Sequence, residues 1–140
     1  MNGRFFLDTN AFVYLFDTTA PAKAKKAARL VRGAVDTVKG IVSYQVVQEF
    51  FKVAFRRFAE PMTAAEAEQY LITVFRPLLA IHSSPALFVE ALRIAGKCRL
   101  AWYDSIMVAS ALEGQCDTLY SEDFQHGREI EGLRIENPFV

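Results

Sequence analysis

The chain has 140 residues, no formal net charge, 52% hydrophobic residues and 12 phenylalanines, which is enough core material for one folded domain over residues 1–140 and excludes a disordered chain. No apolar run approaches the ~20 residues that a membrane-spanning helix needs, and the first residues lack a signal-peptide pattern. Cys98 and Cys116 form no zinc motif, so we expect a cytoplasmic protein with reduced cysteines.

Strand and helix patterns alternate along the chain. Residues 4–8 are predicted as a short buried strand, and residues 11–16 as a short helix. Pro21 begins a basic helix that we expect to end near Gly33. Further strands are expected at 37–43, 78–82, 117–121 and 133–137. Further helices are expected at 44–58, 63–75, 84–99 and 104–114. This alternation indicates a mainly parallel sheet that is covered on both faces.

Two of the predicted strands are followed by acidic residues. Asp8 stands directly after the buried strand in "RFFLDTN", and Asp123 follows "TLY" by three residues. An ionised carboxylate at the end of a core strand is costly unless its charge is compensated. Because ligands bind beyond the carboxyl ends of strands in such sheets, we expect the first and fourth strands to be neighbours, with Asp8 beside Asp123.

Two further acids lie on helices that suit the same pocket. Glu49 is in the first turns of the helix over 44–58, on the edge of its apolar face. Asp104 starts "DSIMVASALEG", a helix too apolar to lie on the surface. Taken singly, Asp8 and Asp104 are credible helix caps, Glu49 a solvated residue and Asp123 a turn residue.

Four carboxylates in one pocket would repel one another and need cations. Oxygen ligands favour hard divalent ions such as Mg²⁺ or Mn²⁺. A metal held this way can bind a phosphate oxygen, orient a water molecule and lower its pKa, as in metal-dependent nucleases.

Four segments carry a family resemblance: "FLDTN", "VVQEF", "WYDSIMVASALEGQCDTLYSEDFQHG" and "LRIENP". With them, essentially the whole chain resembles the PIN-domain ribonucleases of the VapC toxin type. The resemblance implies an α/β fold, a three-layer α/β/α sandwich with a five-stranded, mainly parallel sheet. It also implies an Mg²⁺- or Mn²⁺-dependent endoribonuclease. Its catalytic and metal-binding acids would be Asp8, Glu49, Asp104 and Asp123, supported by Asn10 and Ser121.

The resemblance also implies an RNA substrate, a small antitoxin partner and a homodimer. The candidate dimer surfaces are the long helix over 44–58 and the helix that contains "ALFVEALRIAG". A basic stripe on the helix after Pro21 is either a solvated face or a contact for RNA phosphates or for an antitoxin. This stripe consists of Lys25, Lys26, Arg29 and Arg32.

Two other functions stay open. A haloacid-dehalogenase-like phosphatase also places an Asp after its first strand, but it needs a second acid where this chain has Asn10. A PIN module that binds RNA or protein without cleavage is the other alternative. Near the acids, we expect Trp102 and Tyr103 to pack the pocket wall rather than stack on bases, and Glu122 to point away from the metals.

Overall fold

The computed structural model describes residues 2–140, which form a six-stranded sheet in the order β3-β2-β1-β4-β6-β5. The strands are β1 (Phe5–Leu7), β2 (Gly40–Ser43), β3 (Leu79–Ile81), β4 (Thr118–Tyr120), β5 (Glu129–Ile130) and β6 (Leu133–Glu136). β1 pairs in parallel with both β2 and β4, and β5 alone runs antiparallel, to β6. The expected adjacency of the first and fourth strands is therefore confirmed.

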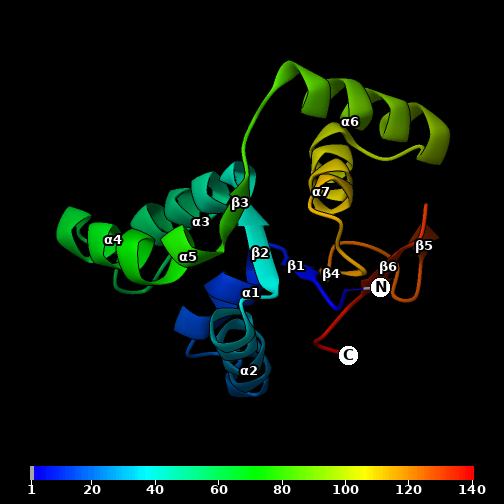
Figure 1. Ribbon diagram of the computed structural model, residues 1–140. Coiled ribbons are helices and arrows are strands. Elements are labelled where there is room, and N and C mark those ends of the chain that lie inside the picture. The colour runs from blue at the N-terminus through cyan, green and yellow to red at the C-terminus, as the bar shows by residue number, and fades with distance from the viewer. Residues whose placement is uncertain (1) are drawn as a thin grey trace.

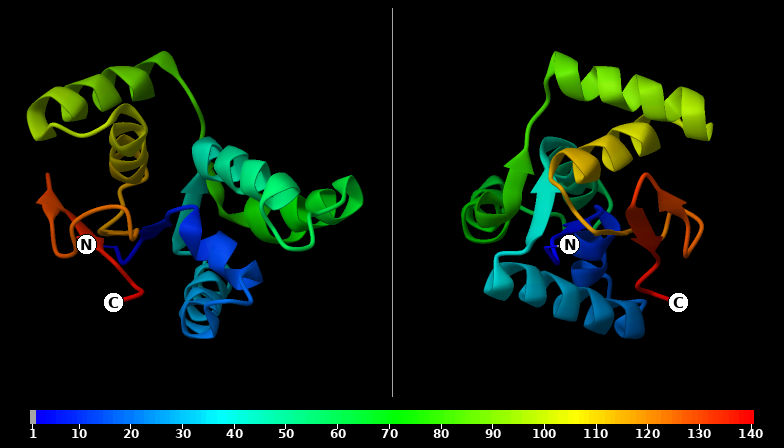
Figure 2. Two further views of the ribbon diagram at one scale, coloured as in Figure 1. Left: turned by 180° about the vertical axis from the view of Figure 1, so that it is seen from behind. Right: turned by 45° about the vertical axis from the view of Figure 1, so that its right-hand side comes forward.

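Helices cover the sheet on both sides. They are α1 (Asn10–Val13), α2 (Pro21–Thr37), α3 (Tyr44–Arg56), α4 (Ala64–Tyr70), α5 (Arg76–Leu78), α6 (Pro85–Cys98) and α7 (Trp102–Glu113), with the 3₁₀-helix η1 (Tyr14–Phe16) and the π-helical turn η2 (Leu71–Phe75). In Figure 1, α7 lies on one side of the sheet with α6 outside it, and α2 lies on the other side. Both views of Figure 2 show α6 lying across the outside of α7.

The expected α/β architecture with a mainly parallel sheet is confirmed, but the expected count of five strands is wrong. The additional strand is β5, which spans two residues and pairs with β6 across a tight turn at Glu131 and Gly132, both with positive φ. A two-residue strand is too short to show a period-2 pattern in the sequence.

Two predicted helices are longer than expected. α2 continues through Gly33 to Thr37, because Ala34 is fully buried and gains more from packing than the glycine costs. The helix expected over 63–75 continues through η2 and α5 to Leu78, which is also buried.

The helix α7 is buried on all sides along most of its length. Seven consecutive residues, Ser105 to Ala111, are buried, because α6 packs on one side of α7 and the sheet lies on the other. A helix held between two layers brings its amino-terminal turn, which contains Asp104, to the edge of the sheet. Among residues 2–140, no helix is both long and apolar enough to cross a membrane.

Candidate functional site

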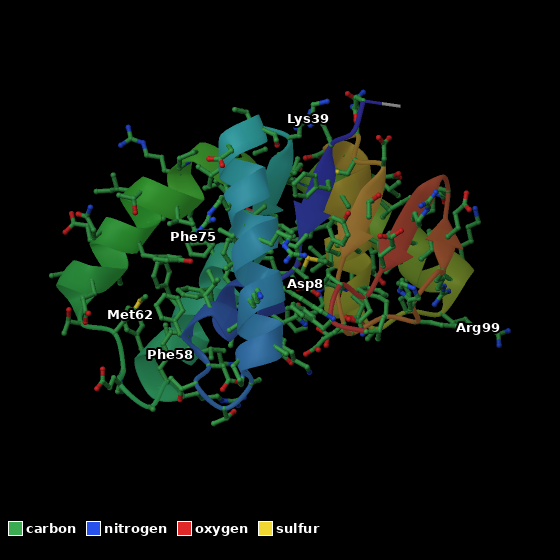
Figure 3. The ribbon with its side chains drawn as sticks, turned by 90° about the horizontal axis from the view of Figure 1, so that it is seen from below. Asp8, Lys39, Phe58, Met62, Phe75 and Arg99 are labelled. Carbon is green, nitrogen blue, oxygen red and sulfur yellow. The ribbon has the colours of Figure 1, made fainter. Side chains whose placement is uncertain are left out.

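Asp8 is the most buried carboxylate at this edge of the sheet, with a relative exposure of 3%. Its Oδ1 accepts a hydrogen bond from the Thr9 N–H at 2.6 Å, and its Oδ2 accepts one from the Ser121 hydroxyl. Burial raises the pKa of Asp8 to about 7, against these two hydrogen bonds, and the charges of Asp123 and Glu49 raise it further. Figure 3 shows Asp8 near the middle of the molecule.

Glu49 is held by two side chains that sequence reasoning missed. The Thr9 hydroxyl donates to Glu49 Oε2 at 2.8 Å, and Gln45 Nε2 donates to Glu49 Oε1 at 3.0 Å. The same Gln45 nitrogen donates to the Tyr103 carbonyl at 3.2 Å, which ties α3 to the first turn of α7. The available signals were the position of Thr9 next to Asp8 and the i, i+4 spacing of Gln45 and Glu49.

Asp104 and Asp123 complete the set from two other elements. Asp104 lies in the first turn of α7, which begins at Trp102, two residues earlier than expected. Burial raises the pKa of Asp104, and the Glu49 charge adds to the effect. Asp123 follows β4, and its N–H donates to Ser121 Oγ at 3.1 Å. Burial raises the pKa of Asp123, with smaller contributions from Glu122, Asp104 and Glu49.

Hydrogen bonds link the segments that carry the four predicted acids: Ser121 contacts Asp8 and the Asp123 N–H, and Thr9 contacts Asp8 and Glu49. Gln45 joins Glu49 to the Tyr103 carbonyl, next to Asp104. The charge of Glu49 contributes to the raised pKa values of Asp8, Asp104 and Asp123. Within residues 2–140, no three His, Cys, Asp or Glu side chains are arranged as a ready-made metal-binding group. The donor chemistry nevertheless fits a hard divalent ion, since carboxylate oxygens predominate and a cation would offset the burial and the repulsion that raise these pKa values.

The two predicted supporting residues have different surroundings. Ser121 is fully buried and bridges the acids, because its hydroxyl donates to Asp8 and accepts from the Asp123 N–H. Asn10 starts α1, and its Oδ1 is buried with no hydrogen-bond partner among the described residues. Glu122 is directed to other groups, since it accepts hydrogen bonds from the Tyr14 hydroxyl and, at 3.4 Å, from Lys23 Nζ.

A cleft of about 490 Å³ adjoins the acids. Its lining consists of Thr9, Gln45, Gln48, Glu49, Lys52, Val53, Arg57 and Tyr103. Tyr103 lies in the wall of this cleft, as expected, with a relative exposure of 67%, whereas Trp102 is not among the lining residues. Trp102 is 39% exposed and packs against Phe88, with ring centroids 6.0 Å apart.

The predicted basic stripe lines a different hollow. Lys25, Arg29 and Arg32 surround a space of about 460 Å³ on α2, together with Asp36, and none of the four acids contributes to its lining. Lys26 Nζ instead donates to the Val140 carbonyl at 3.4 Å.

A larger hollow of about 650 Å³ is also remote from the acids. It lies among Phe16, Phe58 and Met62, and none of the four carboxylates lines it. Figure 3 shows Phe58 and Met62 together on one side of the molecule, away from Asp8. The largest of these three hollows therefore does not coincide with the four predicted acids.

Comparison with known proteins gives a consistent fold. The family model of the PIN domain matches residues 5–128. No curated protein matches the chain significantly. VapC20 of Mycobacterium tuberculosis, described as a toxin that cleaves the sarcin-ricin loop, has a similar structure. It has 18% sequence identity and a TM-score of 0.60, over 86% of this chain and 89% of that one.

Two further structures share the fold. FitAcB of Neisseria gonorrhoeae has 14% identity and a TM-score of 0.61, over 96% of this chain and 98% of that one. FitAB bound to an IR36 DNA fragment has 14% identity and a TM-score of 0.65, over 97% of this chain and 96% of that one.

Proposed function

The chain belongs to the PIN domain family, and on that premise we propose that it is a divalent-metal-dependent endoribonuclease, the toxin of a toxin–antitoxin pair. The observation that carries the proposal is the buried Asp8 at the end of β1, which Ser121 links to the Asp123 backbone and Thr9 links to Glu49. A buried acid with a pKa near 7 beside other acids is a costly arrangement, and such arrangements are typical of functional sites.

In the proposed site, Asp8, Glu49, Asp104 and Asp123 hold Mg²⁺ or Mn²⁺. The metal would supply Lewis-acid stabilisation of the phosphate and a water of lowered pKa. The protein's part is to hold the ligands in place: Ser121 and the Thr9 N–H orient Asp8, while the Thr9 hydroxyl and Gln45 orient Glu49. Hydrogen bonds of this kind to a ligand's own oxygens fix its direction and tune its basicity.

The proposal extends to partners and setting. We propose that residues 1–140 form a single cytoplasmic nuclease domain that works as a homodimer and is inhibited by a small antitoxin. The toxin activity described for VapC20 supports this biological role. Lys25, Lys26, Arg29 and Arg32 are proposed to contact RNA phosphates or acidic side chains of the antitoxin, because positive charge on α2 suits either polyanion.

A metal-dependent cleavage assay tests the nuclease proposal. We expect the wild type to cleave RNA with Mg²⁺ or Mn²⁺ and to lose this activity with a chelator. Asp8→Asn should slow cleavage by on the order of a hundredfold or more, because the amide keeps the shape but loses the charge that holds the cation.

The matched control is Glu113→Gln, which removes one charge from the exposed far end of α7. Glu122→Gln is a poorer control than the sequence suggested, because Glu122 contacts Tyr14 and Lys23 beside the Asp123 loop. Wild-type cleavage by Asp8→Asn would refute the site. RNA binding without any metal-dependent cleavage would instead support the non-cleaving PIN module. The phosphatase alternative lacks its second acid, because Asn10 occupies that position.

A further inference from the structure

We propose that the cleft beside Glu49 is a binding subsite for single-stranded RNA, in which Lys52 and Arg57 hold backbone phosphate and Tyr103 stacks on a base. The inference rests on the proposed nuclease function. It specifies where the RNA next to the cleaved phosphodiester bond would bind. The cleft adjoins the proposed metal site, because Glu49 lines it together with Thr9, whose hydroxyl donates to Glu49.

The two cations in the cleft are free to meet an anion. Lys52 and Arg57 are exposed, and no ion pair among residues 2–140 includes either of them. Lys52 follows Gln48 by four residues, so both side chains lie on one face of α3. Positive charge beside four carboxylates has a clear use, since it offsets the repulsion between those acids and an approaching polyanion.

Tyr103 supplies the stacking surface. It is 67% exposed and lies in the first turn of α7, directly before Asp104. An exposed aromatic ring beside cations is the usual platform for the bases of a single strand. Its backbone is fixed, because the Tyr103 carbonyl accepts from Gln45 Nε2 at 3.2 Å.

Gln45 gives the cleft a built polar wall. Its side chain is only 4% exposed, and its Oε1 has no hydrogen-bond partner among residues 2–140. The Nε2 of the same amide donates to both Glu49 and the Tyr103 carbonyl, so Gln45 holds the wall of the cleft rigidly between α3 and the first turn of α7.

The choice between RNA and an acidic peptide follows from this combination. Lys52 and Arg57 would accept either polyanion, but the exposed Tyr103 ring beside them offers a stacking surface that suits a base and not a glutamate side chain. Stacking on aromatic side chains is a feature of single-stranded RNA recognition.

The test is a binding titration by fluorescence anisotropy with a labelled ten-nucleotide single-stranded RNA. A chelator prevents metal-dependent cleavage, and the full chain is used. We expect Lys52→Gln and Arg57→Gln each to weaken binding and to lower the slope of log K against log salt by about 0.7 for each phosphate that the protein no longer neutralises. Tyr103→Ala should weaken binding about tenfold, whereas Tyr103→Phe should bind like the wild type.

Arg56→Gln is the matched control, because Arg56 is exposed on the same helix and does not line the cleft. Equal losses with Arg56→Gln and Lys52→Gln would overturn the subsite, as would failure of the wild type to bind the strand. Stronger binding of a poly-glutamate peptide through the same three residues would overturn the assignment to RNA. RNA binding through the cleft without metal-dependent cleavage would support the subsite and refute the nuclease proposal. Normal cleavage together with unaltered RNA binding by the cleft variants would support the nuclease proposal and refute the subsite.

Discussion

Asp8 places a buried carboxylate directly after the core strand β1. Its two oxygens accept hydrogen bonds from Thr9 and Ser121, which partly compensate the cost of its burial. The compensation is incomplete, because the pKa of Asp8 still rises to about 7. A cation bound at the proposed metal site would stabilise the charged form.

This raised pKa makes the stability of the metal-free protein depend on pH. Between pH 3.8 and about 7, Asp8 binds more protons in the folded protein than in the unfolded chain, so the free energy of unfolding falls as pH rises. Each pKa unit is worth about 1.4 kcal/mol. Urea unfolding in a chelator should show this fall for the wild type, and Asp8→Asn should flatten it, since an amide does not titrate.

Glu113→Gln serves as the control for this pH series and should keep the wild-type slope. A wild-type slope in Asp8→Asn would mean that Asp8 titrates alike in both states, contrary to its buried surroundings.

At the same scale, the four acids and the supporting Ser121 were predicted from the sequence, but the contacts of Thr9 and Gln45 with Glu49 were not. The strand-end rule placed Asp8 and Asp123 together, and the apolar run after Asp104 predicted a buried helix. Thr9 and Gln45 gave no comparable signal, because polar residues beside a strand end or at a helix start are common for local reasons. Their contacts with Glu49 depend on how α1, α3 and α7 meet.

At the scale of elements, the contact between α2 and β2 depends on Gly40. A Cβ on Gly40 would lie 2.7 Å from Ala34 Cα and 2.8 Å from Phe5 Cε2, so α2 and the Phe5 ring would have to move. We expect Gly40→Ala to lower the free energy of unfolding by about 1–3 kcal/mol.

Gly33→Ala is the contrasting variant. Gly33 lies within α2, and a Cβ there would meet nothing within 4 Å, so alanine should raise stability by up to about 1 kcal/mol. Thermal unfolding of both variants tests the pair. Equal effects of the two substitutions would contradict the close contact at Gly40.

The element boundaries show where local signals fail. The helices were expected to end near Gly33 and at Phe75, yet buried Ala34 and Leu78 keep both segments helical. Tertiary packing thus outweighed propensities worth about 1 kcal/mol for a glycine. The parallel direction of the main strands followed from the alternating pattern, and the adjacency of β1 and β4 from the positions of Asp8 and Asp123. The short β5 forms because the turn before β6 folds it back.

At the scale of the whole molecule, exposed apolar side chains suit a homodimer. Val89 and Leu92 on α6 are 63% and 61% exposed, and Phe55 on α3 is 45% exposed. Large apolar side chains grouped on a surface commonly mark an interface. Light scattering at micromolar concentration should give about twice the 15.8 kDa mass of one chain.

Leu92→Lys should shift this protein toward the monomer, because a charge would be buried at the interface. Val38→Lys is the control, since Val38 is exposed but lies after α2 rather than on α6 or α3. A monomeric wild type, or equal behaviour of the two variants, would count against this dimer surface.

Asp8, Glu49, Asp104 and Asp123 are proposed to hold a divalent metal together. Anomalous X-ray scattering from crystals soaked in Mn²⁺ is the direct test. We expect an anomalous peak among the four carboxylates, with manganese bound directly, at ~2–2.6 Å, or through a bridging water. The Asp8→Asn protein, soaked in the same way, should show a weak peak or none. A manganese peak elsewhere on the molecule, or full occupancy beside Asn at position 8, would contradict the claim.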